Sequence, residues 1–120
     1  MRRKHPIEFA LLALAWLLLV PAASADDNAP PAGRVHVVTI KQMAFHPAAL
    51  EVRVGDTVEW VNEGFVPHNM TAEATPNGER AFASALMPMK AVFRHRVTAA
   101  GTFPYTCTLH PMMTGTLTVK

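Results

Sequence analysis

Six short segments with β-branched or alternating apolar residues limit this chain to few folds. Their period of two residues is that of strands, and turn residues such as Gly55-Asp56 and Gly101 separate several of them. Six strands within residues 34–120 predict an all-β fold, a Greek-key β-sandwich. Residues 70–91 show no regular period, and 81–86 could form a short helix or strand. The predicted strands cover residues 35–40, 50–54, 57–61, 92–97, 102–106 and 114–119.

The N-terminus has the three parts of a secretory signal peptide. Arg2-Arg3-Lys4 precedes an apolar run over residues 9–20, and Ala23-Ser24-Ala25 is a small-residue cleavage site. We expect cleavage after Ala25 and export to the periplasm, with a signal retained as an anchor as the alternative. The apolar run is shorter than the roughly 20 residues that cross a bilayer, so the mature form should not span a membrane.

The remaining chain divides into a lead and one domain. Residues 26–33 are polar and Pro-rich, which predicts a flexible lead, and residues 34–120 are expected to form one monomeric domain. The net charge of +2 comes from the signal peptide, since removal of residues 1–25 takes away three cations and Glu8. A mature chain near neutrality has no cationic run for phosphates, which argues against nucleic acid as a partner.

Cys107 is the only cysteine, so it cannot form a disulfide within the chain. An intermolecular disulfide or a buried free thiol would explain an isolated cysteine, but the neighbours of this one indicate a metal. His110 and Met113 lie with Cys107 in one turn between two predicted strands, and His68 follows the strand at 57–61. A thiolate, two imidazoles and a weak thioether are the donors of blue-copper electron-transfer sites.

Other metals and functions fit these donors less well. Zinc gains little from methionine, and an iron–sulfur cluster or covalent haem needs more cysteines. A site filled by four protein donors leaves no position for a substrate, which argues against an enzyme.

Three motifs resemble the cupredoxin family, in particular its amicyanin branch, with plastocyanin and pseudoazurin more distant. They are Val54-Gly55-Asp56-Thr57-Val58-Glu59-Trp60-Val61-Asn62, Pro67-His68-Asn69, and the segment 100–113 with its Cys-x-x-His-x-x-Met spacing. The short second gap of that spacing matches amicyanin. Two positions depart from it, because Leu109 stands where amicyanins usually have proline and Met112 where they usually have a bulkier ring.

The resemblance implies one type 1 copper ion, with His68, Cys107 and His110 as strong ligands. Met113, and not Met112, would be the weak axial ligand. It also implies that the side chain of Asn69 ties the first ligand loop to Thr108.

The resemblance further implies a one-electron carrier whose electrons pass through the exposed ring edge of His110. Redox partners such as a dehydrogenase or a c-type cytochrome would dock there, on an apolar rim formed by Val66, Pro67, Pro111 and Met112.

A copper-handling protein for resistance or delivery is the alternative function. Met43, Met70, Met87 and Met89 could collect Cu(I), although methionine more often fills a core. Among the other candidates, Trp60 and Tyr105 are expected to pack in the core. His95 is expected to be packed or partly buried rather than a ligand, and His36 and His46 are expected to be exposed.

Overall fold

The structure is a computed structural model that describes residues 33–120. The predicted signal peptide, its cleavage site and the lead up to residue 32 lie outside the described residues. Within the described part, no helix is long or apolar enough to cross a membrane.

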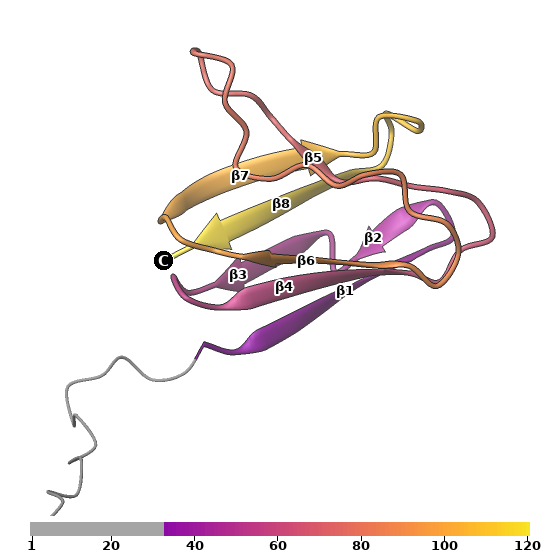
Figure 1. The fold of residues 1–120 in the computed structure, drawn as a ribbon, viewed down its shortest axis with the longest axis horizontal. Coiled ribbons are helices and arrows are strands. Elements are labelled where there is room, and N and C mark those ends of the chain that lie inside the picture. The colour runs from indigo at the N-terminus through magenta and orange to yellow at the C-terminus, as the bar shows by residue number, and fades with distance from the viewer. Residues whose placement is uncertain (1–32) are drawn as a thin grey trace, which may run out of the picture.

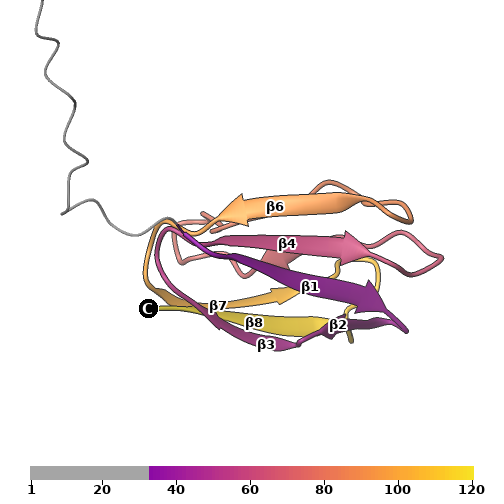
Figure 2. The same ribbon diagram turned by 90° about the horizontal axis from the view of Figure 1, so that it is seen from below.

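Within residues 33–120, eight strands form two stacked sheets, a Greek-key β-sandwich of the predicted class (Figures 1 and 2). One sheet has the order β2-β1-β4-β6 and the other has the order β3-β8-β7-β5. The β1–β4 and β3–β8 pairs are parallel, and the other pairs are antiparallel. The strands are β1 (Val35–Lys41), β2 (Ala44–His46), β3 (Ala49–Val52), β4 (Thr57–Asn62), β5 (Thr71–Ala72), β6 (Val92–Arg96), β7 (Gly101–Thr106) and β8 (Thr114–Val119).

All six predicted strands are present, and the two that the sequence did not reveal are the shortest. β2 has three residues and β5 has two, which is too short for a period of two to be recognised. Residues 81–86 were expected to form either a short helix or a strand. This segment forms neither a helix nor a strand. Ala83 within it forms an isolated bridge to Thr71, and Met87, just after it, forms one to His68.

The core between the sheets is centred on Trp60, which is fully buried as predicted. Its Nε1 donates a hydrogen bond to the hydroxyl of Tyr105 at 3.2 Å, and the two rings meet edge to face. Phe45 packs against Tyr105 from β2. Such aromatic pairs add about 0.5–1.5 kcal/mol each beyond the area that they bury. Cys107 directly follows β7, two residues after Tyr105, and it is buried in the same interior.

His95 and His46 also lie where the sequence placed them. His95 is half-buried against the ring of Phe82, and this burial lowers the pKa of its imidazole. His46 is exposed.

The expectation for His36 was wrong. It is half-buried, and its Nε2 lies 2.9 Å from Oδ2 of Asp56. The carboxylate of Asp56 also accepts the backbone N–H groups of Arg53 and Arg34, and these two bonds, with the His36 bond, lower its pKa to about 2. The parallel pairing of β1 with β4 brings His36 to Asp56, and the sequence alone does not reveal that pairing.

Candidate metal centre

The loop between β7 and β8 carries three of the four predicted ligands. Thr106 and Thr114 pair at its base. Within the loop, the N–H of Cys107 donates to the carbonyl of Met113 at 3.1 Å, and the N–H of Met113 donates to that of His110 at 2.8 Å. The N–H of His110 in turn donates to the carbonyl of Cys107 at 3.3 Å. The backbone of the loop therefore fixes the relative positions of these residues.

The fourth predicted ligand, His68, comes from a separate segment of the chain. It follows the loop 63–67 after β4, and it is buried. Its N–H donates to the carbonyl of Met87 at 3.2 Å, and the N–H of Met87 donates back at 2.8 Å. This reciprocal pair holds the backbone of His68 against the segment that leads to β6.

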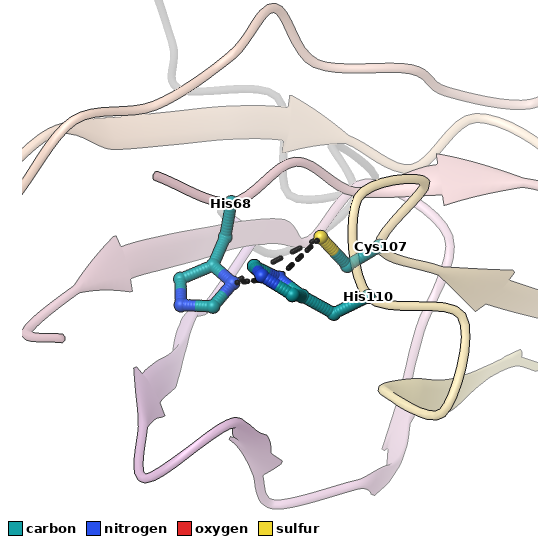
Figure 3. A group of neighbouring side chains, drawn as sticks. All are labelled: His68, Cys107 and His110. Atoms are coloured by element: carbon teal, nitrogen blue, oxygen red, sulfur yellow. Dashed lines mark hydrogen bonds between the residues drawn. The ribbon is translucent and has the colours of Figure 1, made fainter. Parts of the chain in front are cut away.

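The side chains of His68, Cys107 and His110 point toward one another (Figure 3). Sγ of Cys107 lies 3.8 Å from Nδ1 of His68 and 3.6 Å from Nδ1 of His110, and the two Nδ1 atoms are 3.2 Å apart. Three electron-pair donors thus face one shared point from two separate loops.

The donor triangle has the size that a metal ion needs. A point equidistant from three atoms at these separations lies about 2.1 Å from each, close to ordinary metal–nitrogen and metal–sulfur bond lengths. Burial, and then the charge of nearby His110, lower the pKa of His68, which favours the neutral imidazole that a metal binds. One thiolate with two imidazoles suits copper.

The two neighbouring methionines of the loop have opposite environments. Met113 is buried, whereas Met112 is 82% exposed. Met113 lies directly before β8, at the end of the loop that also carries Cys107 and His110.

The predicted contact between Asn69 and Thr108 is confirmed. Nδ2 of Asn69 donates to the hydroxyl of Thr108 at 2.6 Å, and the N–H of Thr108 donates to Oδ1 of Asn69 at 2.9 Å. The segment that carries His68 and the loop that carries Cys107 are therefore joined directly.

His110 is half-buried, and several large apolar residues are exposed on its loop and on the loop before His68. The sequence interpretation missed Phe65, which is 93% exposed in the loop before His68. The other large apolar residues exposed on these two loops are Val66, Leu109 and Met112.

The four other methionines within residues 33–120 divide into two pairs. Met70 and Met87 are buried in the core, while Met43 and Met89 are exposed. Half of the thioethers considered for copper collection are therefore core residues.

Comparisons with known proteins agree with this geometry. Residues 33–120 match the family described as copper binding proteins, plastocyanin/azurin family. Amicyanin of Paracoccus denitrificans is 37% identical over 108 residues, which cover 90% of this chain and 82% of that protein. Plastocyanin of a Synechococcus strain is 33% identical over 79 residues, covering 62% of this chain and 58% of that protein.

Solved structures give the same result. A mutant of amicyanin in its Cu(I) form aligns with a TM-score of 0.66 at 37% identity, covering 72% of this chain and 82% of that one. An oxidised amicyanin mutant also aligns with a TM-score of 0.66, at 36% identity, covering 78% and 87%. The chain thus belongs to the plastocyanin/azurin family of copper-binding proteins, as an amicyanin- and plastocyanin-like cupredoxin that carries electrons.

Proposed function

We propose that this protein is a periplasmic one-electron carrier and not an enzyme. His68, Cys107 and His110 would be the strong ligands of one type 1 copper ion, and Met113 the weak axial ligand. The observation that carries the proposal is the triangle of Sγ and two Nδ1 atoms with sides of 3.2–3.8 Å. When bound, copper supplies the Cu(I)/Cu(II) couple that takes up and releases one electron.

The residues around the triangle suit repeated electron transfer. Cys107 and His68 are buried, so water has little access to the donors from the interior side. The loop hydrogen bonds and the Asn69–Thr108 pair hold the donors in one arrangement, so little of the protein has to move when the charge of the ion changes.

Electrons would enter and leave through His110. It is the one member of the triangle that is not buried, and exposed apolar residues lie on both loops beside it. A redox protein such as a dehydrogenase or a c-type cytochrome would dock on this rim, with the carrier acting as a monomer.

We further propose that residues 1–25 are a cleaved signal peptide, that 26–33 form a flexible lead and that 34–120 form the copper domain. The charged n-region, the apolar run and the small-residue site support export. Expression of the full chain in a bacterium, followed by N-terminal sequencing of the periplasmic fraction, tests this directly. A mature protein beginning at Asp26 is expected, and retention in the membrane fraction would contradict cleavage.

The visible absorption spectrum of residues 26–120 after addition of Cu(II) tests the electron-carrier proposal. We expect an intense thiolate-to-copper band with one copper per chain, bleached by ascorbate and restored by ferricyanide. A colourless protein that still binds copper would overturn the ligand set and favour copper handling by methionine and histidine.

A further inference from the structure

Asn62 is a fully buried polar residue at the end of β4. Val58 and Trp60 occupy the inward positions before it, and they are apolar. A primary amide in such a place costs free energy unless its polar atoms are hydrogen-bonded. The partners of Asn62 therefore indicate what the residue does.

The amide of Asn62 is bonded to the two backbone segments that hold His68. Its Oδ1 accepts the N–H of Gly64 at 2.9 Å, and its Nδ2 donates to the carbonyl of Val66 at 3.0 Å. Its second Nδ2 bond goes to the carbonyl of Met87 at 3.0 Å. That carbonyl also accepts the N–H of His68, so Asn62 and His68 share one acceptor.

The main chain of Asn62 strengthens the same connection. Its N–H donates to the carbonyl of Ala91 at 3.0 Å, and its carbonyl accepts the N–H of Lys90 at 2.6 Å. Loop 63–67 and segment 87–91 are thus both fastened to this one residue.

The loop also packs closely at Gly64. A Cβ added there would lie 3.2 Å from Oδ1 of Asn62 and 3.5 Å from Nε2 of His68. Gly64 therefore lies close to both the side-chain amide of Asn62 and the imidazole of His68. A displacement of the loop would move His68.

We propose that Asn62 is a positioning residue for the copper site. Its side chain folds loop 63–67 and fixes the backbone of His68, so that the imidazole meets Cys107 and His110 before copper arrives. This inference rests on the proposed ligand set. Residues that orient metal ligands typically change metal affinity about 10–100-fold when they are removed.

Asn62→Ala tests the proposal, with Val58→Ala as the matched control. Both residues are fully buried on the same face of β4, but only Asn62 bonds to the loop. We expect Asn62→Ala to weaken copper affinity about 10–100-fold and to broaden the thiolate-to-copper band. Val58→Ala should lose stability without either change.

Amide hydrogen exchange in the copper-free protein supplies a second readout. Asn62→Ala should speed exchange of the His68 N–H at least about tenfold over that in Val58→Ala, because its acceptor segment is no longer held. If Asn62→Ala fails to fold, Asn62→Ser, whose hydroxyl can still accept the Gly64 N–H, should show the same changes at smaller size.

The outcomes separate this inference from the proposed function. Copper affinity, band width and His68 exchange that match those of Val58→Ala would overturn the positioning role. If the wild-type protein lacks the thiolate-to-copper band, the proposed ligand set fails. In that case faster His68 exchange in Asn62→Ala would still support a role in folding the loop, whereas unchanged exchange would overturn it.

Discussion

Asn69 and Thr108 exchange two hydrogen bonds across the copper site, one through each polar atom of the Asn69 amide. They are the neighbours in sequence of His68 and Cys107, and 39 residues separate them. The β5–β7 ladder pairs Thr71 with Thr106 just beyond these residues. The Asn69–Thr108 pair extends that connection to the residues next to His68 and Cys107.

We expect Asn69→Ala to accelerate copper loss to a chelator more than Thr108→Val does. The first change removes both hydrogen bonds, whereas the second removes the hydroxyl and keeps the backbone N–H that Asn69 accepts. Each bond contributes about 0.5–1.5 kcal/mol, so the two variants should differ about twofold to tenfold in copper affinity. Equal rates of copper loss in both variants and the wild type would show that the bridge does not hold the ligands.

The second prediction compares Met113→Ala with Met112→Ala. Met113 is buried, so its truncation should lower the free energy of unfolding by about 2–5 kcal/mol, shift the reduction potential and leave copper bound to three donors. Met112 is 82% exposed, and its truncation should leave the spectrum and potential nearly unchanged. Cyclic voltammetry and thermal unfolding measure both effects. If the effects of the two variants were exchanged, the axial ligand would be Met112.

Gly115→Ala should destabilise the sandwich. Gly115 pairs with Tyr105 across β7 and β8, and an added Cβ would overlap the Tyr105 ring. The ring cannot move aside easily, because it is buried and bonded to Trp60. We expect a loss of about 1–3 kcal/mol or more by chemical denaturation.

A double variant provides the control for this steric explanation. Tyr105→Ala removes the ring, so Gly115→Ala should cost much less in that background than in the wild type. Additive losses would mean that the overlap with Tyr105 is not the cause.

The parts of this structure that the sequence predicted are those with a local signal. Six strands have a period of two residues, and Cys107, His110 and Met113 lie within one short loop. The Asn69–Thr108 contact came from the family resemblance. These features need only short segments or known motifs to be recognised.

The parts that it did not predict depend on strand pairing and backbone contacts that have no pattern of their own in the sequence. Strands β2 and β5 are defined by their partners in the sheets rather than by a pattern of their own. The side chain of Asn62 bonds to backbone atoms of loop 63–67 and of Met87. Because these partners are backbone groups, the identities of the residues do not indicate the bonds. The sequence did contain one indication of this role, since Asn62 is a polar residue at an inward-facing position of an alternating strand.

The last prediction concerns acid stability and Asp56. Hydrogen bonds from Arg53, Arg34 and His36 lower the pKa of this carboxyl to about 2, from 3.8 in an unperturbed chain. The folded state therefore binds fewer protons than the unfolded state between these values, so stability from Asp56 is complete above pH 3.8 and decreases as the pH falls toward 2.

Asp56→Asn should be less stable than the wild type at pH 6, and the difference should shrink toward pH 2. Urea unfolding of the copper-free protein measures this without metal release. Glu51→Gln is the control, because among residues 33–120 its exposed carboxylate pairs only with Lys120, at 3.1 Å, and should matter little. A constant difference between wild type and Asp56→Asn across this range would contradict the assigned role.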